Sequence, residues 1–177
     1  CGTASRAREK KLKDIPEHKQ PRPLRNQGHP RGIPLALQGK KPYTETDSKR
    51  LHQANEIYDF VSALAARAHS LGAHFWIENP KRSWMWELEG FLQLARLPGV
   101  KTHDLQLCMF GGTRPKWASF MTNIQSFGDI VKVCDGNCIH APWQAFNSAN
   151  GPSFDTASEA EYPSGLCEAL SRLIMDL

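Results

Sequence analysis

Apolar residues recur at helical spacing most clearly over residues 47–71. The periodic positions that share one predicted face are Leu51, Ala54, Ile57, Tyr58, Val61, Leu64, Ala65, Ala68 and Leu71. Asp47 or Ser48 is a suitable N-cap for this helix, and Gly72 is a suitable residue to end it. The apolar run at 73–78 predicts a strand directly afterwards, and such an α-then-β step is typical of a layered α/β fold.

The same patterns predict further elements towards the C-terminus. They are a helix over 84–96, a hairpin of strands at 100–110 and 117–121, a short helix at 126–130, a short strand at 131–134 and a helix over 163–176. Ser83 caps the first of these helices and Pro98-Gly99 stops it. Residues 135–155 have no regular pattern, and Thr156 with Glu159 fits a capping box. We therefore predict an α/β fold, a partial doubly wound sheet with flanking helices.

The N-terminal region differs in composition from the rest of the chain. Residues 1–50 hold 13 of the 22 Lys and Arg and 5 of the 18 Asp and Glu, a net charge of +8, whereas the remainder carries −4. Six prolines interrupt residues 1–45, so we predict an irregular basic segment there, with one short helix near 4–13, and an α/β half-domain over 46–177. The basic segment indicates either a polyphosphate partner or a solvated tail.

Cysteine usage and hydropathy limit the location. Five cysteines without the traits of a disulfide scaffold favour a reducing compartment, so we expect an intracellular protein, with the nucleus as one option. No run approaches twenty apolar residues, so no membrane span is expected.

One cysteine cluster raises the question of a metal. Cys134, Cys138 and His140 are close in sequence, and Cys108 is a candidate fourth ligand. The C-x3-C-x-H spacing is unusual for structural zinc, so the sequence favours ordinary thiols, and no metal is assigned. A zinc-stabilised interaction domain built on these four residues stays open as an alternative.

Two polar clusters follow predicted strands. Glu78-Asn79-Pro80 ends the first strand, and Thr113-Arg114-Pro115-Lys116 follows the strand at 100–110. The edge of a sheet where strands end is a usual place for ligand-binding groups in α/β folds. Cys1 adds a thiol, and a thiol, a carboxylate and two cations are what attack on a pyrimidine requires. The thiolate adds to C6 of the ring, an acid shares a proton with N3, and cations hold a phosphate or the ring oxygen.

On these residues the chain resembles the DNA cytosine-C5 methyltransferases, and most closely the diverged methyltransferase-like domains of retroelement polyproteins. Cys1 with Ser5 matches the spacing of that family's nucleophile motif, and Glu78-Asn79-Pro80 matches its Glu-Asn-Val strand end. Residues 110–118 match its Tyr-Gly-Val-Pro-Gln-x-Arg-x-Arg turn loosely. The family glutamine falls on Arg114, its first arginine on Lys116 and its second on Ala118.

The resemblance implies Cys1, Glu78 and Arg114 as catalytic residues and Ser5, Asn79 and Lys116 as substrate-binding residues. It also implies S-adenosylmethionine as methyl donor and DNA as partner. It covers only the C-terminal part of the catalytic domain, and the glycine-rich turn that would hold the donor is absent from the sequence. We therefore expect a missing N-terminal half and no methyl transfer by this fragment alone.

Two other functions stay open, and the oligomeric state is left undetermined. The first is a non-catalytic nucleic-acid-binding module of a retroelement protein, in which residues 1–50 supply the affinity and binding depends strongly on salt. The second is an adenine-N6 methyltransferase, which is disfavoured because its Asp-Pro-Pro-Tyr type of motif does not occur.

Overall fold

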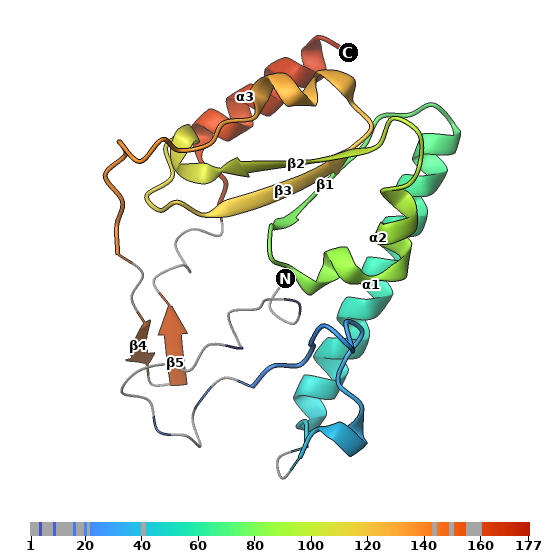
Figure 1. Cartoon of the computed structure of the whole chain (residues 1–177), viewed down its shortest axis with the longest axis vertical. Coiled ribbons are helices and arrows are strands. Elements are labelled where there is room, and N and C mark those ends of the chain that lie inside the picture. Colours follow the sequence, from blue (N-terminus) through green and yellow to red (C-terminus); the bar gives the residue numbers. More distant parts are fainter. Residues whose placement is uncertain are drawn as a thin grey trace.

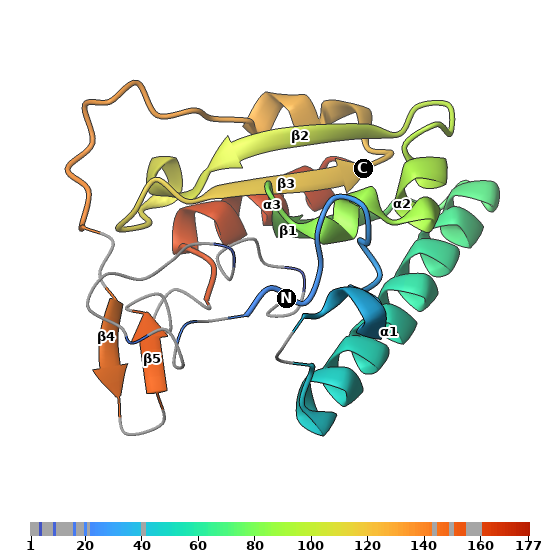
Figure 2. The same cartoon turned by 60° about the horizontal axis from the view of Figure 1, so that its bottom comes forward.

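A three-stranded antiparallel sheet with helices on both faces forms the centre of the structure (Figures 1 and 2). The computed structural model describes residues 4, 9, 16, 20, 22–39, 42–142, 145–148, 151–154 and 161–177. Helices α1 (Glu45–Ser70) and α2 (Glu89–Leu94) cover one face, and α3 (Ser164–Met175) covers the other. The α/β class is thus confirmed at this coarse level.

The sheet brings two strand ends together at one edge. Its order is β1 (Trp76–Pro80), β3 (Trp117–Thr122) and β2 (Lys101–Gln106), with β3 antiparallel to both neighbours. Because β1 and β2 therefore run in the same direction, both end beside the start of β3. The register pairs Pro80 with Ala118 and Gln106 with Trp117. We call this the carboxyl edge of the sheet.

Helix α1 confirms the strongest periodic pattern but not its cap. Thr44 is the N-cap, and it forms a capping box with Asp47, whose backbone N–H it accepts. Gly72 follows the helix at φ +71°, the left-handed conformation that glycine adopts most easily at a helix end. The buried face is narrower than predicted, since only Tyr58, Ser62 and Ala65 are fully buried.

An apolar stripe therefore stays on the outer side of α1. Its residues recur at helical spacing, and they are Ile57, Phe60, Leu64 and Leu71, each more than half exposed. We call these four residues the α1 stripe.

The first strand begins later than the sequence predicted. Residues 73–75 are held by the side chain of Asn123, which accepts a hydrogen bond from the Phe75 N–H at 3.0 Å and donates to the Ala73 carbonyl at 2.9 Å. These side-chain bonds replace the ladder there. At the other end the strand includes Pro80, which a strand at the edge of a sheet tolerates. Glu78, predicted as the last residue of the strand, and Asn79, predicted to follow it, consequently both lie inside β1.

The helix predicted over 84–96 is two shorter elements. Ser83 does cap the first, a 3-10 helix η4 (Trp84–Glu87), but the extended backbone of Leu88 separates it from α2. The second packs closely on α1, because a Cβ atom at Gly90 would lie only 2.4 Å from the Ser62 hydroxyl.

In the C-terminal half, α3 confirms the helix predicted over 163–176, and the structure departs from the predicted elements at two places. The hairpin of β2 and β3 is present, joined through a 3-10 helix η5 (Leu107–Phe110), and another 3-10 helix, η6 (Gln125–Ile130), stands near the predicted 126–130. The strand predicted at 131–134 is absent among the described residues, and those residues bond instead to Gln106. A pair of strands, β4 (Ala145–Ser148) and β5 (Gly151–Phe154), occupies part of the region predicted to be irregular. Thr156 and Glu159 lie outside the described residues.

Two apolar cores lie on the two faces of the sheet. One joins α1, α2 and η4 to Met121, and the other joins α3, η5 and η6 to Leu105 and Phe120. Gly165 allows α3 to approach η5, since a Cβ atom there would lie 2.8 Å from the Phe110 carbonyl oxygen.

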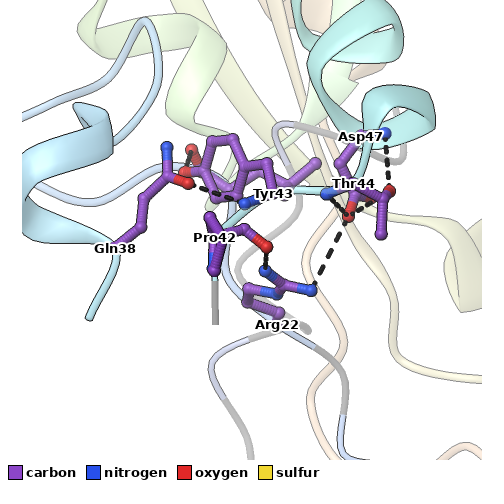
Figure 3. Close-up of polar contacts among 7 residues, drawn as sticks. Arg22, Gln38, Pro42, Tyr43, Thr44 and Asp47 are labelled. Carbon is purple, nitrogen blue, oxygen red and sulfur yellow. Dashed lines mark hydrogen bonds and ion pairs between the residues drawn. The ribbon is translucent and has the colours of Figure 1, made fainter. Parts of the chain in front are cut away.

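Part of the basic N-terminal segment is attached to α1. Arg22 donates to the Pro42 carbonyl and lies 4.0 Å from Asp47 at the start of the helix (Figure 3). Arg31 makes two 2.7 Å hydrogen bonds with Asp59, and the buried Arg25 bonds to Asn55 at 2.8 Å. These three arginines therefore contribute to the fold rather than to a purely solvated tail.

Candidate functional site

Glu78 is half-buried near the carboxyl end of β1, on the side of the sheet that α3 covers. Its Oε2 accepts a 2.6 Å hydrogen bond from the hydroxyl of Tyr162, which lies just before α3. Burial and this carboxylate both raise the pKa of Tyr162 well above its ordinary value, so the phenol keeps its proton, and its hydrogen bond to Glu78, to a higher pH than an exposed tyrosine would. A fixed carboxylate at the end of a strand can accept a hydrogen bond from, or share a proton with, a ligand.

Asn79 points to the opposite face, because neighbouring residues of a strand alternate. It is 3% exposed, and its Nδ2 lies 2.8 Å from the sulfur of Met85. Its Oδ1 is buried and has no hydrogen-bond partner among the described residues. Glu78 and Asn79 therefore face opposite sides of the sheet. The sequence pattern had indicated that they act together on one surface.

The cationic turn at 113–116 lies at the carboxyl edge but is aimed away from Glu78. Arg114 is buried, and its Nε donates to the Pro142 carbonyl at 3.0 Å. The backbone of Lys116 continues the edge, since its carbonyl accepts from the Leu107 N–H at 2.9 Å. Glu78 and the turn thus share an edge, with Glu78 on the β1 side and Arg114 directed to the loop beyond β2.

Cys1 and Ser5 lie outside the described residues, so their predicted roles stay predictions. Ala4, which stands between them, is fully buried, and its carbonyl accepts a 2.9 Å hydrogen bond from the Trp84 N–H. Trp84 also donates through its indole N–H to Glu9 at 2.8 Å. These two contacts place Ala4 and Glu9 beside η4, close to the end of β1.

A second polar group at the edge was not predicted from the sequence. Lys81 lies 2.9 Å from Asp104 and 4.3 Å above the ring of Trp117, and Ser119 donates to the same aspartate. This network ties the end of β1 to β2 across β3. Asp104 is one of several polar residues in Lys101–Gln106, so no local pattern in the sequence distinguished it.

Four potential metal ligands converge next to the cationic turn. Each of Cys108, Cys134, Cys138 and His140 offers one ligand atom, and these atoms all lie within 4.8 Å of one another. The Cys134 sulfur is 3.7 Å from Nε2 of His140. Cys108 comes from η5, whereas the other three come from the loop after η6. We call these four residues the Cys3His cluster.

The electrostatics of this cluster favour one thiolate over the other two. The Gly136 N–H, 3.4 Å from the sulfur, lowers the pKa of Cys134 from its ordinary value. Burial raises the pKa of Cys108 to about 11, and the hydrogen bond with Cys134 raises the pKa of Cys138. Negative charge on one sulfur disfavours charge on its neighbours, as expected for closely spaced thiols.

A cavity of about 270 Å³ lies between α3 and η6, with Asp129, Lys132, Arg172 and Asp176 among its lining residues. It has no glycine-rich turn at the end of a strand, which is the feature that would hold a nucleotide-like methyl donor. The described residues around this cavity thus do not fit S-adenosylmethionine.

None of the helices in the described part of the chain is both long and apolar enough to span a membrane.

Comparisons with known proteins do not identify this site, because no protein-family model, curated protein or solved structure matches the chain.

Proposed function

We propose that the carboxyl edge of the sheet is the cytosine-contacting edge of a diverged DNA cytosine-C5 methyltransferase-like domain. The observation that carries the proposal is Glu78, a half-buried carboxylate near the end of a strand, held in place by Tyr162 at 2.6 Å. A carboxylate fixed in this way can read the Watson–Crick edge of a cytosine, because it accepts from the amino group and shares a proton with N3. Such a base must first leave the duplex stack.

The other residues have defined roles in this proposal. Cys1 is the nucleophile that adds to C6 of the ring, with Ser5 beside it. Arg114 and Lys116 form the cationic side of the edge, and Asn79 supports the strand from the opposite face. The contacts of Ala4 and Glu9 with Trp84 support this arrangement, because they hold part of the N-terminal segment near the end of β1.

The proposal also includes an N-terminal half of the methyltransferase-like domain that this chain does not contain. The sheet ends at β1 and β2 among the described residues, and no further strand pairs with the outer side of β1 there. Further parallel strands on the open side of β1 would complete a doubly wound sheet. The methyl donor would be held there, since the described residues around the cavity beside α3 do not fit it. This chain alone should therefore bind DNA without methylating it.

The test compares binding of two fluorescent DNA duplexes that differ only in one mispaired base. We expect the chain to bind the duplex with a mispaired cytosine about 10-fold more tightly than the duplex with a mispaired thymine, which is the discrimination that one good base contact supplies. Glu78→Ala should remove the preference. Glu89→Ala, which removes an exposed carboxylate from α2, is the matched control and should keep it.

Equal binding of the two duplexes by the unaltered chain, or a preference that survives Glu78→Ala, would refute the proposal. Binding without base preference that weakens steeply with salt, and that falls when the exposed Lys49 and Arg50 are neutralised, would identify the non-catalytic module instead. That second candidate is favoured only by the net charge of +8 on the N-terminal region.

A further inference from the structure

We propose that the Cys3His cluster is a structural zinc site that fastens the loop after η6 to the end of β2. The inference does not depend on the proposed function, because it concerns residues that the cytosine-contacting edge does not use. Three features of the described residues support the site: the spacing of the ligand atoms, the contacts around them and the poor apolar packing of the loop.

The spacing of the ligand atoms suits tetrahedral coordination. Zinc bonds thiolate sulfur at about 2.3 Å and imidazole nitrogen at about 2.0 Å, so tetrahedral ligands lie about 3.5–3.8 Å apart. The distance between the Cys134 sulfur and His140 Nε2 is 3.7 Å, and all four ligand atoms lie within 4.8 Å of one another. A disulfide would involve only two of the three thiols and would not account for the position of His140 beside them.

The set of ligands indicates which metal and which role. Three thiolates and one imidazole are soft and borderline donors that select zinc over magnesium or calcium. Four protein ligands close the coordination shell, so no position is open for water or substrate. The site is therefore structural rather than catalytic.

The backbone around the cluster is already shaped for ligation. Gly136 adopts φ +92°, and its N–H points to the Cys134 sulfur, where it would stabilise a bound thiolate. Asp135 accepts hydrogen bonds from the backbone and side chain of Asn137, which closes the turn between the two cysteines. The Gln106 side chain accepts the Cys134 N–H at 2.8 Å and ties the turn to β2.

The loop has little else to hold it. Ile139 is fully exposed and Val133 is about half exposed, so apolar burial contributes little there. Among the described residues, one backbone hydrogen bond joins this loop to β2, from the Gln106 N–H to the Lys132 carbonyl, and another joins it to the 113–116 turn, from the Ala141 N–H to the Thr113 carbonyl. A metal that joins four side chains would supply the missing stabilisation.

The proposed site would also fix the cationic turn. Thr113 and Arg114 both bond to the end of the zinc loop, at Ala141 and Pro142. Metal binding to the loop would therefore hold the 113–116 turn at the carboxyl edge, which gives the site a structural purpose beyond the loop itself.

The test measures zinc in protein purified without added chelator. We expect one zinc ion per chain by elemental analysis, and we expect cobalt substitution to give absorption typical of tetrahedral coordination with three thiolates. Cys138→Ser should reduce the zinc content to a small fraction. Cys167→Ser, on the exposed surface of α3, is the matched control and should leave the content unchanged.

A histidine variant separates a ligand from a residue that only supports the fold. His140→Ala should lose the metal, whereas His140→Cys, which restores a ligand, should retain it. Absence of zinc from the unaltered chain, a cobalt spectrum without thiolate bands, equal loss in Cys167→Ser, or failure of His140→Cys to retain metal would each overturn the proposal. These measurements use no DNA, so their outcome is independent of the base-preference test.

Discussion

At the scale of single residues, the hydrogen-bond partners of Glu78 and Asn79 decide which face of the sheet each side chain serves. Glu78 and Asn79 are neighbours in sequence, yet one accepts from Tyr162 near α3 and the other contacts Met85 on the opposite face. The alternation of a strand separates them, and the predicted end of that strand at residue 78 concealed that Asn79 also lies inside it. Tyr162 follows Glu78 by 84 residues and was not predicted to be its partner.

The hydroxyl of Tyr162 should stabilise the fold at pH values below 10.0, the ordinary pKa of a tyrosine. Its pKa is raised in the folded chain by burial and then by Glu78, so the folded state holds the proton more tightly than the unfolded state. Tyr162→Phe should therefore cost about 1 kcal/mol at pH 7. The difference should shrink as pH rises above 10, because only the unfolded tyrosine gains by ionising.

Urea denaturation of both proteins at pH 7, 9 and 10.5 checks this expectation. Tyr58→Phe is a useful control, since no hydrogen bond of its hydroxyl is described. A difference between unaltered protein and Tyr162→Phe that stays constant across the series would contradict the assignment of the hydrogen bond.

At the scale of elements, long periodic segments were predictable and short ones were not. Helix α1, helix α3 and the β2–β3 hairpin follow directly from periodicity, turn glycines and proline. The misplaced start of β1 and the absent strand at 131–134 share one cause. In both, a side chain of another segment, Asn123 or Gln106, bonds to backbone that a ladder would otherwise satisfy. Local patterns do not encode such distant partners.

The cap of α1 provides a test at this scale. Thr44→Ala should destabilise the protein by about 1 kcal/mol, because it removes the hydroxyl that accepts the Asp47 N–H. Ser48→Ala, at a position that the sequence offered as a cap but that lies inside the helix, should change the free energy of unfolding by only a few tenths. Chemical denaturation monitored by circular dichroism gives both values, and equal effects would contradict the capping box.

At the scale of the whole molecule, the approach of the four Cys3His side chains could not be predicted from their spacing along the sequence. The C-x3-C-x-H spacing alone favoured ordinary thiols, because a zinc site normally needs a second pair. The sequence offered Cys108 as a candidate fourth ligand, but β3 and η6 separate it from the other three along the chain, and it is the fold that places its sulfur near theirs. At the carboxyl edge the sequence predicted polar groups near the strand ends, but it did not predict that Glu78 would contact Tyr162 or that Arg114 would bond to Pro142.

The α1 stripe gives a prediction for the whole molecule. Four large apolar side chains in one exposed row exceed what an isolated surface usually carries, so we expect the chain to self-associate as its concentration rises. Phe60→Glu with Leu64→Glu should abolish this association. The free energy of unfolding should change by no more than about 0.5 kcal/mol, because both residues are exposed.

Sedimentation velocity over a concentration series measures the association. The matched control is Lys49→Glu with Arg50→Glu, which makes exposed charge changes near the start of the same helix and should leave association intact. A sedimentation coefficient independent of concentration in the unaltered chain would contradict the prediction.

The convergence of one early cysteine with three later ligands has a consequence during synthesis. A nascent chain that has only just released β3 from the ribosome presents Cys108 alone, and the remaining ligands emerge last among the residues of that corner. Until then the new polypeptide keeps a reactive thiol with no metal to occupy it. With the proposed zinc site, this corner of the protein can reach its final structure only after Cys134, Cys138 and His140 have been synthesised and have bound the metal together with Cys108.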